Sequence, residues 1–170
     1  MATPDAAADI FHPDGSLRLD LLTEPALEAV RESLRQARET CWDSVRSPHV
    51  FMGLLAAPDR GVRNWGERLE EDLSTILTQF QELFRQDESE EEPVLALNRE
   101  FLSDNVIRLL RDAQRRAASN RRSQITPMDL LISMLTAPNS IVAECFERIG
   151  VTAARLTELA VIAEQQAAGE

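Results

Sequence analysis

Apolar residues recur every three or four positions in two long stretches of the chain, the spacing of one face of an α-helix. In the first stretch they are Ala26, Leu27, Val30, Leu34, Ala37 and Cys41, and in the second Val106, Ile107, Leu110, Ala113 and Ala117. A hydroxyl residue precedes each stretch, Thr23 or Ser103, and its side chain can cap the first turn of a helix. The pattern predicts two amphipathic helices that begin after these residues.

A shorter segment that is apolar on most sides follows each of these helices. Both segments start at a hydroxyl residue next to proline, Ser47-Pro48 and Thr126-Pro127, a pairing typical of a helix start. Proline also ends both segments, because it cannot continue a helix. Their apolar residues are Val50, Phe51, Met52, Leu54 and Leu55 in the first, and Leu130, Leu131, Met134 and Leu135 in the second. We expect helices of this kind in the middle of a bundle.

The two stretches are copies of one unit. A shift of 80 residues places 22–59 over 102–139 without a gap, and the break Ala57-Pro58 falls over Ala137-Pro138. Each copy continues into a short third helix and a longer fourth helix, and in the second copy Gly150 separates the two. The sequence therefore predicts an all-α fold of eight helices, arranged as two four-helix units.

The same reading divides the chain into five parts. We expect an N-terminal extension (1–16), a first repeat (17–85), an acidic linker (86–96), a second repeat (97–165) and a tail (166–170), with both repeats in one compact domain. Acidic residues ending in a proline are typical of a solvated linker. The first dozen residues and the last six are expected to fray.

Composition removes several kinds of chemistry. All 18 basic residues are arginine, so a nucleotide-binding P-loop and Schiff-base catalysis, which need lysine, are excluded. Neither His12 nor His49 has a second ligand at metal-binding spacing. Cys41 and Cys145 are far apart and are interpreted as small buried hydrophobes. We expect no catalytic residues, no metal and no cofactor.

Charge and hydropathy limit the partners. A net charge of −11 argues against nucleic acid, since neutralising phosphate supplies most of that affinity. No apolar run approaches the roughly 18 residues of a membrane span. The start, MATPDAAADIF, has no basic or apolar region of a signal peptide. A protein partner and a cytoplasmic location are therefore expected.

The second copy resembles the N-terminal repeat of Clp-family AAA+ unfoldases. The residues that carry the resemblance are Ile125, Asp129, Leu130, Leu131, Met134, Leu135, Val142, Ala143, Phe146, Gly150 and Val151. The first copy matches through VRSPHVFMGLLAAPD but has no Gly-Val pair after its third helix. The resemblance implies a double Clp-N repeat: one eight-helix domain with pseudo-twofold symmetry.

The resemblance also implies a function. Such domains bind adaptors and substrate segments for a protein unfolding or degradation machine and perform no chemistry themselves. Two alternatives remain open: a stand-alone accessory subunit that stabilises a Clp protease or chaperone assembly, and the N-domain of a secretion-associated unfoldase that binds a partner helix. Phosphoarginine recognition is not expected, because the glutamate of the family's T-E-H triplet is absent from Ser47-Pro48-His49 and from Pro127-Met128-Asp129.

Six residues are candidates for binding a protein partner. Arg108, Arg111, Arg115 and Arg122 fall within one stripe of a continuous helix, which would face an acidic partner, the acidic residues 88–92 of the chain itself, or only solvent. Thr23 lies where the family often has a threonine near its substrate groove, although a plain helix cap also explains it. Trp42 is either a packing residue or an exposed anchor.

Overall fold

The computed structural model of the chain describes residues 9–87 and 94–169. This part holds eight α-helices and two short 3₁₀ turns, which confirms the predicted all-α fold. The first repeat consists of η1 (Leu19–Leu21), α2 (Glu24–Glu39), α3 (Ser47–Ala56), α4 (Arg60–Leu69) and α5 (Leu73–Phe84). The second consists of η2 (Arg99–Phe101), α6 (Asp104–Ser119), α7 (Pro127–Thr136), α8 (Ile141–Glu147) and α9 (Ala153–Ala168).

The shift of 80 residues in the sequence is also present in the backbone. The turn η1 and the helices α2 and α3 begin and end at positions equivalent to those of η2, α6 and α7. Cys41 and Arg121, which follow α2 and α6, both adopt a left-handed conformation, with φ of 67° and 61°. Glu70 and Gly150 share a second left-handed position, with φ of 59° and 90°. The two repeats therefore turn at the same places.

Backbone hydrogen bonds cross reciprocally between the repeats. The Thr23 amide donates to the Ile125 carbonyl, and the equivalent Ser103 amide donates to the Val45 carbonyl, both at 3.0 Å. In return, the Ile125 amide donates to Leu21 and the Val45 amide donates to Phe101, both at 2.8 Å. Each of these four bonds thus has a partner bond in which the repeats have exchanged roles, as the predicted pseudo-twofold axis requires.

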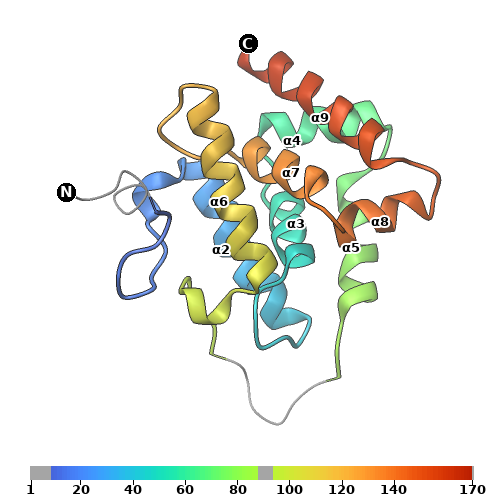
Figure 1. Cartoon of the computed structure of the whole chain (residues 1–170). Helices are drawn as coiled ribbons and strands as arrows, with labels where there is room; N and C mark the ends of the chain where they lie inside the picture. Colours follow the sequence, from blue (N-terminus) through green and yellow to red (C-terminus); the bar gives the residue numbers. More distant parts are fainter. Residues whose placement is uncertain (1–8, 88–93, 170) are drawn as a thin grey trace.

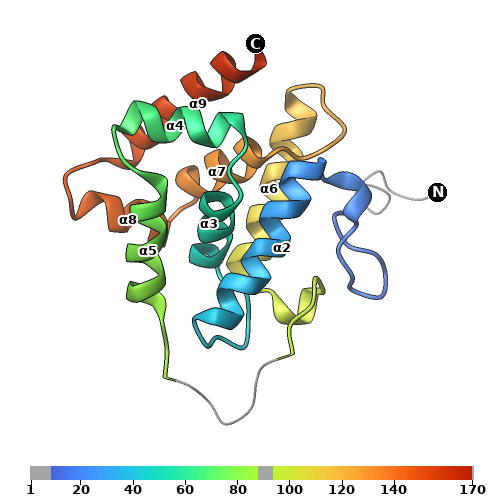
Figure 2. The same cartoon turned by 180° about the vertical axis from the view of Figure 1, so that it is seen from behind.

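The helices form three groups across the molecule. Figures 1 and 2 view the α2 and α6 pair from opposite sides, with α3 and α7 in the middle and α4, α5, α8 and α9 beyond them. Nearly every residue of α3 and α7 is buried, as predicted for helices that are apolar on most sides. Beside α3, the rings of Phe51, Trp65, Phe80 and Phe146 form one aromatic cluster.

Some boundary predictions were wrong. Ile10 and Phe11, expected to fray, are buried in the core, and α9 continues to Ala168. Cys41 lies beyond the end of α2, half-buried, rather than on its buried face. Thr126 caps α7 as predicted, whereas Ser47 is the first residue of α3 and not its cap. The acidic segment 88–93 and its predicted contact with the arginine stripe lie outside the described residues.

A close approach between α2 and α3 gives a direct test of this packing. A Cβ at Gly53 would lie 2.3 Å from the Ala29 carbonyl oxygen, so Gly53→Ala would force the two helices apart. We expect a loss of about 2 kcal/mol or more of unfolding free energy, measured by urea denaturation. If helix propensity alone mattered, Gly53→Ala would raise the unfolding free energy by about 1 kcal/mol. Steric overlap and helix propensity therefore predict changes of opposite sign.

Gly169→Ala is the matched control, because its nearest neighbours would lie 3.6 Å and 3.7 Å from the new Cβ, at ordinary contact distance. A Gly53→Ala variant as stable as the Gly169→Ala variant would contradict the close packing of α2 on α3.

Candidate protein-binding surface

An apolar groove opens between α5 and α8, which Figures 1 and 2 both show side by side at one edge of the molecule. Its volume is about 140 Å³. Ile76, Phe80 and Phe146 are buried and form its floor. Leu83 and Ile149 form its rim and are 58% and 67% exposed. Large apolar side chains this exposed on both sides of one hollow are typical of a surface that binds another protein.

The polar side chains of the groove lie at its edge, so its lining remains mainly apolar. Glu71 and Gln79 stand at its edge, and both are exposed. Cys145 lies half-buried in the wall, and burial raises the pKa of its thiol despite the opposing charge of Arg148. The thiol is therefore protonated at neutral pH and contributes a small, uncharged surface to the groove.

The equivalent place in the other half of the molecule is closed. By the repeat relation, α8 and α5 correspond to α4 and α9, and α4 packs closely along α9. Trp65 of α4 is fully buried there and donates its indole N–H to the Leu156 carbonyl at 3.1 Å. In the groove, Cys145 stands at the position equivalent to Trp65, and Ile76 at that of Leu156. The two places differ in helix spacing as well as in side chains: α5 and α8 lie further apart than α4 and α9, and beside Cys145 the large Phe146 stands at the position of Gly66.

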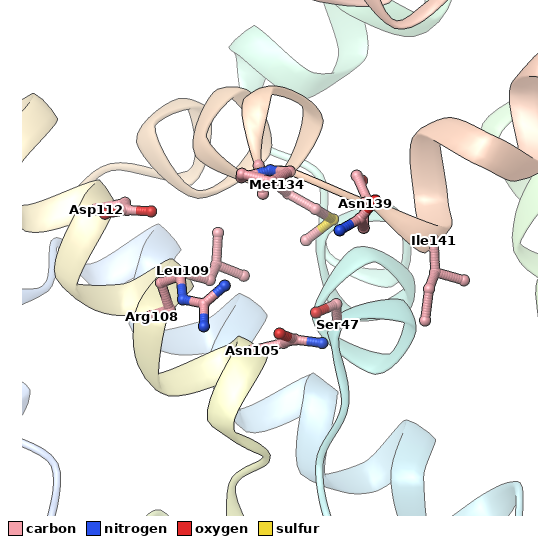
Figure 3. Close-up of a pocket in the computed structure, with 11 residues that line it drawn as sticks. Ser47, Asn105, Arg108, Leu109, Asp112, Met134, Asn139 and Ile141 are labelled. Atoms are coloured by element: carbon pink, nitrogen blue, oxygen red, sulfur yellow. The ribbon is translucent and has the colours of Figure 1, made fainter.

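A second, polar pocket lies between α6, the start of α3 and the α7–α8 connection (Figure 3). Asn105 of α6 and Ser47 of α3 face each other in it, and Arg108 lies one turn further along α6. Its volume is about 30 Å³, near the volume of one water molecule, so it cannot admit a side chain. A larger polar hollow of about 530 Å³ lies between the starts of α4 and α7 and the end of α9, and Arg60, Arg122 and Glu164 line it. The apolar groove differs from both polar hollows because two exposed large apolar side chains stand at its rim.

Two of the predicted site residues have structural partners. The Thr23 hydroxyl caps α2 by accepting the Ala26 amide at 3.3 Å. Trp42 donates its indole N–H to the Phe84 carbonyl at 2.5 Å, and the Arg46 guanidinium lies 5.2 Å from the Trp42 ring centre. These contacts account for both residues within the fold, and their roles in partner binding stay predictions.

The arginine stripe is shorter than the sequence predicted. Arg108 and Arg115 are exposed on α6, and Arg115 pairs with Asp112 of the same helix at 3.0 Å. Arg111 is half-buried, pairs with Asp9 at 3.4 Å and lies 5.9 Å from the centre of the Phe11 ring. Their part in docking stays a prediction, but Arg111 already has a partner in the N-terminal segment.

Arg122 does not belong to this stripe. The helix α6 ends at Ser119, and the left-handed Arg121 turns the chain toward α7. Arg122 instead donates to both carboxylate oxygens of Asp129, one of them at 2.8 Å. The sequence prediction assumed a continuous helix through position 122, and the turn at Arg121 breaks it.

Asp129 is the centre of an ionic cluster. Its carboxylate is fully buried, accepts from Arg116 at 2.7 Å and from the Thr126 amide at 2.9 Å, and closes the capping box of α7. Burial opposes its ionisation, but the hydrogen bonds from Arg122, Thr126 and Arg116 outweigh burial and lower its pKa. Arg116 also forms two hydrogen bonds to Glu164, at 2.7 and 2.8 Å. The cluster thus ties α6, α7 and α9 together.

The equivalent cluster of the first repeat is neutral. His49 stands at the position of Asp129, with Trp42 at the position of Arg122. The His49 Nδ1 accepts the Arg46 amide at 2.9 Å, and the Nε2 lies 3.1 Å from the Thr40 hydroxyl. Because that hydroxyl donates to the Gln36 carbonyl at 2.7 Å, Nε2 carries the proton and the imidazole is neutral.

Neither a membrane-spanning helix nor a cluster of metal ligands occurs in the described residues. Across residues 9–87 and 94–169, no helix has the length and apolar character to cross a bilayer. In the same part of the chain, no three His, Cys, Asp or Glu side chains gather as metal ligands would.

Comparison with known proteins finds a family match for the second repeat. Residues 101–168 match the family model described as the Clp repeat N-terminal domain. The resemblance read from the sequence is thereby confirmed: the second repeat is a Clp N-terminal repeat, and both repeats together have the fold of Clp N-terminal domains. No curated protein sequence matches the chain.

Solved structures share the fold at low sequence identity. The N-terminal domain of the caseinolytic protease associated chaperone ClpD from Arabidopsis thaliana superimposes with a TM-score of 0.67 at 18% identity, covering 89% of this chain and 99% of that one. The Hsp104 N-terminal domain from Candida albicans gives 0.66 at 12% identity, covering 82% and 89%. A complex of the ClpV N-domain with a VipB peptide gives 0.62 at 16% identity, covering 88% and 93%.

The residues of the groove were not among the predicted site residues. The apolar residues of α5 differ in burial although their spacing is that of one helix face: Ile76 and Phe80 are buried, and Leu83 is 58% exposed. A signal was present at Ile149, a large apolar residue in the turn directly before Gly150. A second was the difference between the repeats at this place, where Cys145 and Phe146 stand at the positions of Trp65 and Gly66.

The neutral His49 predicts a pH dependence of stability. Burial, and then the charge of Arg46, lower its pKa from 6.5 to about 4. Between these values the unfolded chain binds a proton that the folded chain does not, so stability falls as the pH falls. We expect His49 to account for a loss of about 2 kcal/mol between pH 7 and pH 5, measured by urea unfolding.

His49→Gln should remove this part of the pH dependence. His12→Gln, at an exposed histidine, should retain it. An unchanged drop between pH 7 and pH 5 in the His49→Gln variant would show that His49 is not held neutral.

Proposed function

We propose that this chain is a non-catalytic recognition domain of a Clp-type protein unfolding or degradation machine, working in the cytoplasm. It binds a segment of an adaptor or substrate protein in the groove between α5 and α8. The observation that carries the proposal is the open groove itself, with two large apolar residues exposed on its rim, at a place whose counterpart is sealed within the fold.

Two further facts support this proposal. The complex of the ClpV N-domain with a VipB peptide pairs a domain of this fold with a peptide ligand. Burying Leu83 and Ile149 against a partner would remove apolar surface from water, at roughly 1.5–3 kcal/mol for each fully buried side chain. Such a gain would favour the binding of a partner segment in the groove.

The test is a selection from a random dodecapeptide library displayed on phage, with the purified chain as bait. Synthetic copies of the enriched peptides are then titrated into ¹⁵N-labelled chain. We expect the amide signals of α5 and α8 to shift, and Leu83→Glu to weaken binding at least about tenfold, because a carboxylate would enter the apolar contact.

Leu19→Glu is the matched control, since Leu19 is also an exposed leucine, 41% accessible, but lies in η1 outside the groove. It should bind the peptides as the unmodified chain does. Enriched peptides whose signals map away from α5 and α8, or that bind Leu83→Glu unchanged, would refute the groove as the recognition site.

A further inference from the structure

We propose that the groove between α5 and α8 receives an aromatic side chain of indole size, from a partner segment that carries basic residues beside it. This inference rests on the proposed function, since it names the chemistry of the segment that the groove would bind. It comes from the volume, lining and charge of the groove, and from a comparison with α4 and α9, the corresponding helices, which pack closely together.

In the closed half, the chain's own tryptophan shows what fits. Trp65 lies between α4 and α9, fully buried, with its indole N–H on the Leu156 carbonyl of the facing helix. In the open half, α8 and α5 are the corresponding helices but lie further apart, and Cys145 supplies only a thiol where Trp65 supplies an indole. A partner's indole in the groove would take the place that Trp65 occupies in the other half, facing the backbone of α5 near Ile76.

The groove has the size and lining for a ring. A cavity of about 150 Å³ lined by aliphatic and aromatic residues binds benzene, and this groove has a volume of about 140 Å³. Phe80 and Phe146 lie on its floor with ring centres 6.2 Å apart. Phe146 also contacts Trp65, at 6.0 Å and an interplanar angle of 70°. A partner ring would extend this aromatic cluster, in edge-to-face or offset contacts that favour it over an aliphatic chain.

Charge at the groove selects the rest of the segment. Glu70, Glu71 and Asp72 occupy three successive positions directly before α5, and Glu71 lines the groove. Glu144 stands next to Cys145 on α8, with Arg148 as the opposing charge near it. The whole chain carries a net charge of −11, so a second copy of the chain would be repelled and a basic segment attracted.

The first experiment needs no knowledge of the partner. N-acetyl-L-tryptophanamide is titrated into the ¹⁵N-labelled full chain, with N-acetyl-L-leucinamide as the aliphatic comparison. We expect the tryptophan derivative to shift the amides of Ile76, Phe80 and Cys145 and to bind about fivefold more tightly than the leucine derivative. Equal affinities, or shifts confined to other helices, would overturn the aromatic assignment.

Substitutions of residues that line the groove also test whether it receives an aromatic ring. Cys145→Trp places an indole where Trp65 stands in the other half and should abolish binding of the tryptophan derivative, whereas Cys145→Ser should leave it unchanged. Ile149→Glu, at an exposed rim residue that the fold tolerates, provides a second block if Cys145→Trp does not fold. Binding that survives Ile149→Glu would overturn the placement of the ring.

A basic and an acidic tripeptide are compared to test the preference of the groove for basic residues. The tripeptide Lys-Trp-Lys should bind about fivefold more tightly than Glu-Trp-Glu at low salt, and the difference should shrink at 1 M sodium chloride. Equal binding of the two tripeptides would overturn the basic part of the proposal.

The outcomes also separate this inference from the proposed function. Library peptides that map to the groove through an aliphatic anchor, while the tryptophan derivative does not bind, would leave the recognition role intact and refute the aromatic anchor. Library peptides that map elsewhere would refute both.

Discussion

The four crossed backbone hydrogen bonds between the repeats are the constraint on which the rest of the structure depends. Thr23 bonds to Ile125 and Ser103 bonds to Val45, so each repeat holds the residue that precedes the central helix of the other. Backbone bonds of this kind fix relative position with little dependence on side chains. They place α3 beside α7, set the pseudo-twofold relation, and so make α4 with α9 and α8 with α5 equivalent contacts. This correspondence is what allows the open groove between α5 and α8 to be compared with the closely packed pair α4 and α9.

Within this frame the two repeats use different chemistry at the same place. His49 in the first repeat and Asp129 in the second are both buried in the first turn of a central helix, and both accept a backbone amide there. Around them, one repeat has a tryptophan and a neutral imidazole, and the other has two arginines and two carboxylates. Both arrangements satisfy their buried polar atoms, which is the condition that a buried site imposes. The shared backbone therefore does not require shared side chains.

The sequence predicted the helices well because periodicity and capping act locally. The cap of α7 at Thr126 and the burial of both central helices follow from patterns within one segment, and the offset of 80 residues repeats those patterns. The site was harder to predict, because an apolar residue in the sequence carries no mark of whether another helix covers it. Leu83 and Phe80 belong to the same stripe, yet only Phe80 is covered. Arg122 was misplaced for a related reason, since one left-handed residue at Arg121 redirects all that follows it.

The reciprocal bonds have a consequence for how such a chain can arise. In a symmetric homodimer both subunits use the same surface, so every contact from one subunit to the other recurs in the opposite direction. A single ancestral repeat could therefore have paired with an identical copy through the same four bonds, carrying two identical edges. Once the two copies were joined in one polypeptide, the amino-acid sequences of the two edges could differ. The pair α4 and α9 could then pack closely around Trp65, while α8 and α5 kept a groove between them.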